Sequence, residues 1–439
     1  MELYQRYPKL PDFGYLKQRL EEHARLKYEY GSSSAAIEQA LNDSYSAMAN
    51  ALETIKNLTE DAAMRACEPD ALEDIRKLRP AASPKLWTIF DAAKYTDRLA
   101  GAFLGRMAGC TLGVPVEFWS VSDMREWAAY IGDPFPPTNY WSSMKNPNSL
   151  RYDVSIVQDY TRSGLRSVPV DDDVTYTLLG LLIAEDYGLD FTIEEAGHAW
   201  VKYLPRACTA EEIALKNLRA GVSGLQAADI DNPFVQWIGA DIRSDPWGYI
   251  APGQPEKAAG MAWKDAWLSH RRNGIYGAMY FSAVISAAFA CDSPIEALRL
   301  GLNEIPSDCL LAQDIRWALE TGTQLMGYED AIKAVQERFG GMSPVHTNLN
   351  ACLVIFGLMI GGDDFTHCIS ETVAMGFDND CTAATVGSIF GASKGIGQIP
   401  SFWYEPFNNT VLTYINGHPS FAIDDVLKRF KTLAESTFN

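Results

Sequence analysis

The sequence of 439 residues lacks several features that would assign it to a familiar class. Its eight cysteines include no C-x-x-C pair, so neither a zinc site nor a dense disulfide framework is expected, and the thiols are predicted to be reduced. Basic residues are few: 37 Lys and Arg against 56 Asp and Glu give a formal net charge of -19. Because nucleic acids and anionic membranes bind clustered cations, neither is an expected partner.

The sequence also predicts neither a secretory signal nor a membrane-spanning segment. The start, MELYQRYPKLPDF, is too polar for a signal peptide, and no window is expected to approach the roughly 18 apolar residues of a membrane span. We therefore expect a cytoplasmic protein. The 47% hydrophobic and 11% aromatic content is that of a globular chain, not of a disordered one.

Alternating β-branched runs are scarce, and the periodic segments predict helices instead. Apolar positions recur at three- to four-residue spacing in segments 13–30, 34–58, 176–188, 278–290, 293–305, 328–340 and 348–360. The predicted class is mostly α. Long charged helices end in the breaker-rich LRPAASP, after which small-residue helices begin, so a domain boundary is predicted near Tyr95. Residues 130–170 are predicted to form a long loop.

The first of two short acidic clusters precedes an almost wholly apolar helix. It consists of Asp171, Asp172 and Asp173 in VPVDDDVTYTLLG. Three consecutive carboxylates repel one another, and a helix N-terminus offsets part of that repulsion, at about 0.3 to 1 kcal/mol for each charge. An acidic helix cap is therefore an alternative to a metal site for this cluster.

The second acidic cluster is Asp378 and Asp380 in GFDND, and a helical segment follows at once. Residues two apart lie on different faces of a helix, so both converge on one ion only from a turn, which Gly376 allows. Behind them, a stripe at four-residue spacing lets another backbone approach: Gly387, Gly391 and Gly395. The five carboxylates suit Mg²⁺ or Mn²⁺, but spacing alone leaves two unrelated helix caps as an equal alternative.

Three motifs, taken in order, resemble the ADP-ribosylglycohydrolase family. They are YTDRLAGAFLGRMAGCTLGVPVEFW, VDDDVTYTLLG and GFDNDCTAATVGSIFGASKGIGQIP, and the resemblance spans residues 95–405. It implies an all-α orthogonal multi-helix bundle. Outside the match, we expect an N-terminal helical extension over residues 1–94 and a tail helix in residues 406–439 that packs on the core. The resemblance also implies a hydrolase that releases ADP-ribose by cleaving an N- or O-glycosidic bond, with ADP-ribosylated protein among the candidate substrates.

The resemblance assigns metal and catalytic roles residue by residue. Two Mg²⁺ ions, with Mn²⁺ as an alternative, would be held by Asp171, Asp172, Asp173, Asp378, Asp380 and Cys381. Asp171 and Cys381 stand where the family has threonine, and a thiol is a poor ligand for Mg²⁺. Catalytic roles on the water or the leaving group would fall to Glu117, Asp172 or Asp378.

The resemblance also predicts a substrate cleft. Its expected substrate-binding residues are Gly109, Gly113, Trp247, Gly248, His270, Asn273, Gly274, Ile275 and Tyr276. Buried aromatic residues and lone histidines at helix ends are more often structural, so that interpretation stays open for Trp247 and His270. Two other functions also stay open: an ADP-ribose-binding protein without turnover, and a hydrolase of a small N-ribosyl metabolite.

Overall fold

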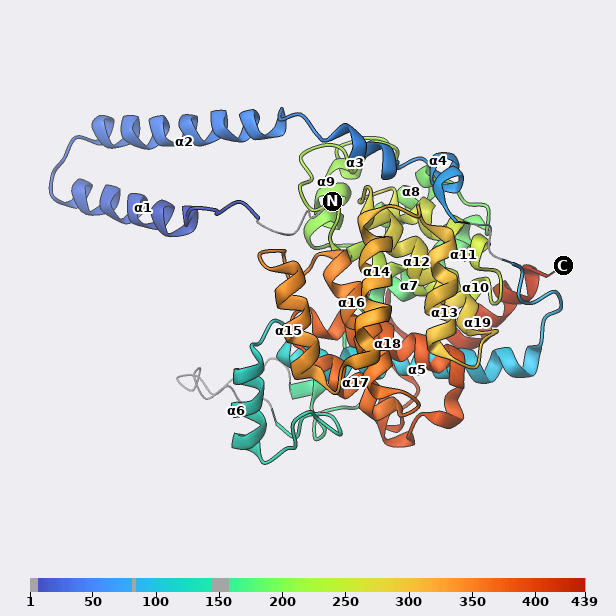
Figure 1. Ribbon diagram of the computed structural model, residues 1–439. Coiled ribbons are helices and arrows are strands. Elements are labelled where there is room, and N and C mark those ends of the chain that lie inside the picture. The colour runs from blue at the N-terminus through green and yellow to red at the C-terminus, as the bar shows by residue number, and fades with distance from the viewer. Residues whose placement is uncertain (1–6, 81–83, 144–157, 439) are drawn as a thin grey trace. The chain divides into compact units, whose positions relative to one another are not determined.

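The computed structural model of the protein describes residues 7–80, 84–143 and 158–438. These residues form two compact units that divide between Ala66 and Cys67. Helices dominate both units (Figure 1), and the sheet in the described residues is a two-stranded antiparallel hairpin of β1 (Thr410–Ile415) and β2 (His418–Ala422). The predicted all-α class is confirmed. Part of the loop predicted for residues 130–170 lies outside the described residues.

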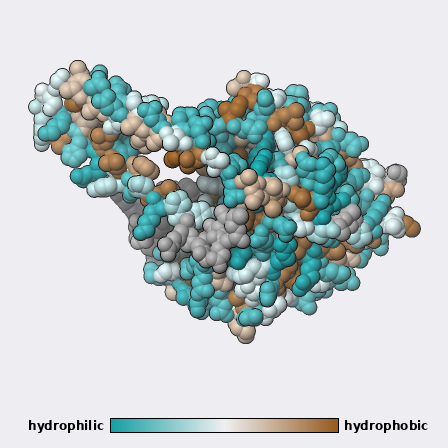
Figure 2. Space-filling model, turned by 45° about the horizontal axis from the view of Figure 1, so that its top comes forward, coloured by the Kyte–Doolittle hydropathy of each residue, from teal (hydrophilic) through white to brown (hydrophobic). Residues whose placement is uncertain are grey.

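The smaller unit holds α1 (Phe13–Glu29), α2 (Ser34–Lys56) and most of α3 (Ala62–Cys67). Asp12 and Ser33 cap the first two helices with their side chains. No residue of α1 or α2 is buried, and apolar side chains such as Leu16, Tyr45 and Leu52 are exposed. Figure 2 shows apolar groups on these two helices scattered among hydrophilic ones. The two helices therefore bury no core of their own.

The larger unit is built from helices that surround a few fully buried ones. In chain order they are α4 (Leu72–Leu78), α5 (Ala92–Gly113), α6 (Val121–Ile131), α7 (Asp172–Tyr187), α8 (Ile193–Tyr203), α9 (Thr209–Arg219), α10 (Asp245–Ile250), α11 (Pro255–Ala266), α12 (Asn273–Ala288), α13 (Pro294–Gly301), α14 (Leu310–Thr321), α15 (Tyr328–Phe339), α16 (Thr347–Gly361), α17 (Phe365–Ala374), α18 (Asn379–Lys394) and α19 (Ile423–Ser436). Every residue of α12 is buried, which places this helix in the core.

Helices α5 and α18 pack at backbone contact, and glycines make this possible. A Cβ added at Gly105 would lie 2.4 Å from the carbonyl oxygen of Gly387. At the C-terminal end of α5, a Cβ added at Gly113 would lie 2.4 Å from the Cα of Asp380. The close backbone approach predicted from the glycine stripe is confirmed. It brings the C-terminal end of α5 to the acidic N-terminal end of α18.

The division between the units falls ahead of the boundary predicted near Tyr95. Residues before α5 already bond to the larger unit: the Glu68 carboxylate accepts a hydrogen bond from the Asn273 side chain at 3.0 Å, and Arg79 pairs with Glu304 at 2.7 Å. Part of the segment predicted as an extension therefore belongs to the larger unit.

The C-terminal segment predicted for residues 406–439 contains the hairpin of β1 and β2 ahead of α19, which the helical patterns did not indicate. The tail helix lies on the core: Phe430 is buried, and its ring centroid is 5.4 Å from that of Tyr249 on α10.

The expectation that no segment is apolar enough to span a membrane is wrong for one described helix. Residues Ala92–Val116, which comprise α5 and the turn after it, pass that test by length and composition. Most of this stretch is buried inside the protein, as core helices are. Large apolar side chains such as Leu99, Phe103 and Met107 are buried in it, which is typical of a core helix.

Candidate metal centre

The two acidic clusters meet at one place in the larger unit. Helix α7 begins at Asp172 and α18 begins at Asn379, so the first turn of each carries its acids to the same point. Their side chains form groups of three in which the possible ligand atoms lie within 4.8 Å of one another, and these groups share members. One group includes Glu117, which follows α5. The structure thus brings together all seven predicted metal-binding or catalytic residues: Glu117, Asp171, Asp172, Asp173, Asp378, Asp380 and Cys381.

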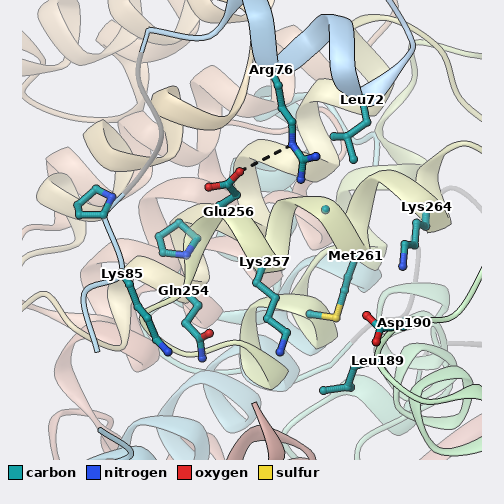
Figure 3. Close-up of a pocket in the computed structure, with 13 residues that line it drawn as sticks. Leu72, Arg76, Lys85, Leu189, Asp190, Gln254, Glu256, Lys257, Met261 and Lys264 are labelled. Atoms are coloured by element: carbon teal, nitrogen blue, oxygen red, sulfur yellow. Dashed lines mark ion pairs between the residues drawn. The ribbon is translucent and has the colours of Figure 1, made fainter. Parts of the chain in front are cut away.

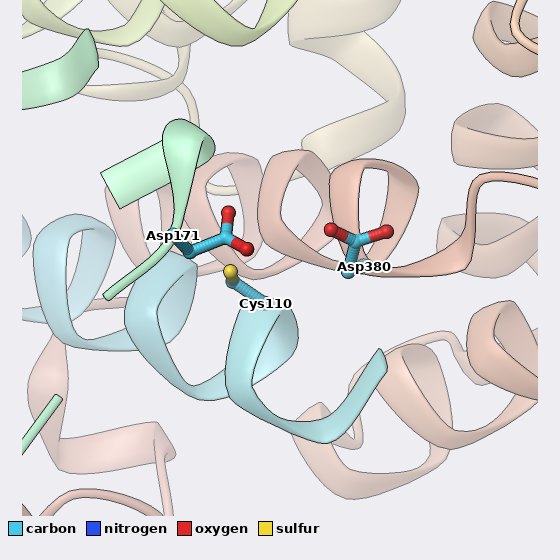
Figure 4. Close-up of side chains that lie close together, drawn as sticks. All are labelled: Cys110, Asp171 and Asp380. Carbon is cyan, nitrogen blue, oxygen red and sulfur yellow. The ribbon is translucent and has the colours of Figure 1, made fainter. Parts of the chain in front are cut away.

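Asp171 is both a helix cap and a member of this cluster. Its carboxylate accepts the Asp173 N–H at 2.9 Å, so the cap interpretation holds for this residue. The same side chain lies within 4.8 Å of the Cys110 Sγ and an Asp380 carboxylate oxygen (Figure 4). Asp378 occupies the N-cap position of α18, yet its side chain makes no capping hydrogen bond. Two unrelated caps therefore do not account for the acids.

Three carboxylate oxygens in the cluster have no hydrogen-bond partner among the described residues. They are Oδ2 of Asp173, Oδ1 of Asp378 and Oδ1 of Asp380, and these residues are 0%, 4% and 2% exposed. Burial of an unpaired carboxylate costs free energy that a bound cation offsets. Carboxylate oxygens are the ligands that Mg²⁺ and Mn²⁺ prefer. The residues present therefore fit a divalent-metal site.

Burial of the acids raises their pKa values. Burial is the main cause throughout, and neighbouring carboxylates add to it: the pKa rises to about 7 for Asp171 and Asp173, against an ordinary value of 3.8, and to about 8 for Glu117. Burial raises the pKa of the other three acids as well: Asp172, Asp378 and Asp380. Without a cation the cluster holds protons near neutral pH, and a cation would favour its ionised form.

Arg106 of α5 is a buried cation beside the cluster that the sequence analysis did not single out. Its guanidinium lies 2.7 Å from Asp173 Oδ1 and 2.9 Å from Asp245 Oδ2, and it donates to the Thr177 hydroxyl at 2.8 Å. It neutralises one oxygen of Asp173 and leaves the other without a hydrogen-bond partner in the described residues. The available signal was a charged residue inside an apolar, glycine-rich helix, where a charge needs a buried partner.

The backbone next to two of the acids is strained. Phe118 and Phe377 have φ angles of 59° and 62°, a region that large side chains rarely adopt and that recurs at functional sites. The Phe118 N–H donates to the Phe377 carbonyl oxygen at 2.9 Å. Gly376 has φ of 74°, as the predicted turn requires. This pairing of strained residues holds Glu117 near Asp378.

Two cavities adjoin the cluster. One of about 230 Å³ has cluster residues in its wall: Glu117, Asp172, Asp378 and Cys381. The other, of about 510 Å³, shares Phe118 with the first and is lined by Trp119, Arg125 and Tyr328. Sites for drug-sized ligands measure about 300–1,000 Å³, so the smaller cavity suits a group of the size of a ribose.

Seven of the predicted substrate-binding residues line neither cavity: Trp247, Gly248, His270, Asn273, Gly274, Ile275 and Tyr276. All of them are buried. His270 Nδ1 lies 2.8 Å from the Ser269 hydroxyl, and burial lowers the pKa of His270 well below its ordinary value. The Trp247 ring stacks on Phe191 at 4.9 Å between centroids. The structural interpretation of Trp247 and His270 fits these contacts, and the structure does not bring the seven residues to the acids.

Gly109 and Gly113 lie near the cluster, but they serve helix packing. A Cβ at Gly109 would lie 2.0 Å from the Ala383 carbonyl oxygen, and one at Gly113 would lie 2.4 Å from the Cα of Asp380. Neither position leaves room for a ligand, so the structure does not support the predicted substrate-binding role of these two glycines.

Comparison with known proteins decides the family. The ADP-ribosylglycohydrolase family model matches residues 91–435. The chain belongs to the ADP-ribosylglycohydrolase family. A protein of Archaeoglobus fulgidus, described as uncharacterized, is 26% identical over 314 residues, which cover 70% of this chain and 91% of that protein. A solved structure titled "ADP-ribosylglycohydrolase-related protein complex" is 20% identical with a TM-score of 0.45, and the match covers 79% of this chain and 98% of that one. Membership of this glycosidase family supports a glycohydrolase-type function.

Proposed function

We propose that this protein is a divalent-metal-dependent hydrolase of an ADP-ribosyl or related ribosyl conjugate. It would cleave the bond between C1 of the ribose and a nitrogen or oxygen atom of the acceptor. The observation that carries the proposal is the convergence of six carboxylates, three of them with unpartnered buried oxygens, beside a cavity of about 230 Å³. The family match supports a glycosyl bond as the target.

Two divalent cations are proposed at this cluster, and when bound they would act as Lewis acids that orient the vicinal hydroxyls of the ribose. Asp173, Asp378 and Asp380 offer the unpartnered oxygens. The thiols of Cys110 and Cys381 lie beside these carboxylates, and both are free. Because sulfur is a softer ligand than the threonine oxygen of the family motif, Mn²⁺ is the better-fitting ion and Mg²⁺ the alternative.

Glu117 is the proposed proton carrier. It is the most exposed of the six acids, it lines the cavity, and burial and the neighbouring acids raise its pKa to about 8 in the metal-free protein. In the reaction a water O–H bond breaks and the water oxygen forms a bond to C1. The bond from C1 to the acceptor breaks, and its electron pair leaves with the acceptor, which gains a proton. Asp172, also in the cavity wall, is the second candidate for this role.

The size of the substrate separates two candidates. The larger cavity has the Trp119 and Tyr328 rings in its wall, which suit an adenine base. The Arg125 guanidinium, which pairs with Glu329, would contact a phosphate group. This favours a conjugate that carries the whole ADP-ribosyl group. The smaller cavity alone would suffice for a small N-ribosyl metabolite, so such a hydrolase is the second candidate.

The test measures ADP-ribose release from ADP-ribosylated arginine and serine peptides, and ribose release from free N-ribosyl compounds. Each is assayed with Mn²⁺, with Mg²⁺ and with EDTA. Asp378→Asn is expected to lower turnover by about a hundredfold or more, since it removes a proposed ligand. Asp308→Asn, an exposed aspartate ahead of α14, is the matched control and keeps wild-type activity. Folded protein that binds ADP-ribose but hydrolyses none of these substrates would contradict the enzyme and favour a recognition protein.

A further inference from the structure

The larger unit has a second concave site that shares no wall residue with the two cavities at the acids. It encloses about 400 Å³ between α4, α11 and residues 84–85 and 189–190 (Figure 3). Helix α11 contributes Lys257, Met261 and Lys264, whose spacing of four and three places them on one helix face. The pocket is therefore organised by a regular, buried element of the fold and is large enough for a small molecule.

Positive charge in this pocket exceeds negative charge. Its three lysines, Lys85, Lys257 and Lys264, make no ion pair within the described residues. Arg76 differs, because its guanidinium lies 3.7 Å from the Glu256 carboxylate (Figure 3). Apart from that paired glutamate, the acid in the wall is Asp190, so three ammonium groups face one carboxylate. On a chain with a net charge of -19, such a concentration of cations needs an explanation.

Burial of these lysines costs free energy. Burial lowers the pKa of Lys257 and of Lys264, and the charge of Lys85 lowers that of Lys257 further, while Asp190 opposes both changes. Lys264 Nζ lies 5.1 Å from the centre of the Phe191 ring, which holds this ammonium in place. A bound anion would offset the desolvation of these ammonium groups.

The remainder of the wall is largely apolar, with side chains of Leu72, Leu189 and Met261. Helix α11 begins at the pocket with Pro255, and its N-terminal end adds partial positive charge. We propose that this pocket binds a phosphate-bearing small molecule with an apolar portion, of the mononucleotide class, at a site separate from the metal centre. The lysines would contact the phosphate, and the apolar wall would contact the remainder of the ligand.

The test is calorimetric titration of the full chain with AMP and with inorganic phosphate in EDTA, which excludes binding through metal at the acids. Wild type is expected to bind AMP, and phosphate more weakly, because the apolar wall contacts the base. The double variant Lys257→Gln, Lys264→Gln is expected to bind AMP about tenfold more weakly or worse. The matched control is Lys333→Gln, Lys428→Gln, which removes the same charge from exposed positions on α15 and α19 and binds as wild type does.

Asp378→Asn should bind AMP in EDTA as tightly as wild type, so this site is judged independently of hydrolysis. The ligand-free double variant is expected to unfold at or above the wild-type temperature, because two partly desolvated ammonium groups are removed; if it does not fold, Lys85→Gln on a separate segment takes its place. The proposal is overturned if wild type binds no AMP in EDTA, if both double variants bind equally, or if phosphate binds as tightly as AMP.

Discussion

The metal-free protein should lose stability as the pH rises. Asp171 and Asp173 have pKa values of about 7 in the folded protein against an ordinary 3.8, since burial disfavours their ionised forms. A raised pKa means that the folded protein holds protons that the unfolded chain releases. The stabilisation is therefore complete below the unfolded pKa of 3.8 and is lost as the pH rises through about 7.

The expected loss is large compared with the stability of a protein. A change of about three pKa units in one independent group corresponds to about 4 kcal/mol, and total unfolding free energies are about 5–15 kcal/mol. The acids share one cluster, so their separate contributions do not add. We expect the melting temperature in EDTA to fall by about 5 °C or more between about pH 5.5 and about pH 8.5.

Thermal unfolding with EDTA and with Mn²⁺ at both pH values measures this effect. Mn²⁺ should stabilise the protein more at the higher pH, because its ligands must be ionised to bind it. Asp380→Asn should flatten the pH dependence in EDTA, whereas the exposed Asp308→Asn should leave it unchanged. A melting temperature in EDTA that stays level or increases with pH would refute the reasoning, as would equal stabilisation by Mn²⁺ at both pH values.

Three further predictions concern the helices that carry the site. Gly387→Ala should cost about 3 kcal/mol or more in urea unfolding, because the added methyl would lie 2.1 Å from a carbonyl oxygen of α5, whereas Gly397→Ala, with no atom within 4 Å, should cost little. Arg106→Met should lower the unfolding free energy by about 3–5 kcal/mol in denaturant titration, since it leaves two buried aspartates unpaired. Cys381→Thr should raise the affinity for Mg²⁺ relative to Mn²⁺ in calorimetry, and an unchanged ratio would show that the thiol is no ligand.

The seven periodic helical segments and the two acidic clusters could be predicted from the sequence, because both depend on local patterns. The apolar period of a helix is local, so both ends of α2 and α16 were predicted to within about two residues, and the start of α12 to within about five. The acids carry a local signal too, because Asp171 and Asp378 each stand where a helix begins. Their convergence was not local: it depends on where α7 and α18 meet, which spacing along the chain does not determine.

The surroundings of several residues could not be predicted, because they depend on which face of a helix points to the acidic cluster. His270 and Tyr276 are close in sequence to a motif that borders the cleft in the resembling family, but both are buried in packing contacts here. Arg106 was not predicted to belong to the site, because its neighbours in sequence are apolar and small. Only the placement of α7 and α10 brings its two partners, Asp173 and Asp245, to the guanidinium. The positive φ angles of Phe118 and Phe377 have no sequence signature, because these side chains do not favour that conformation.

Packing between α5 and α18 helps to form the candidate metal centre. Gly105 packs against Gly387, and Gly113, at the C-terminal end of α5, packs against the backbone of Asp380. These close contacts fix the position of α18 along the axis of α5. A slip by one helical turn would move Asp380 by about 5.4 Å. That is more than the 4.8 Å within which its carboxylate meets the other ligand atoms, so the slipped arrangement would separate the two acidic clusters. The glycines contact no ion, yet a change in this interface should weaken metal binding together with stability, because the same backbone contacts determine both.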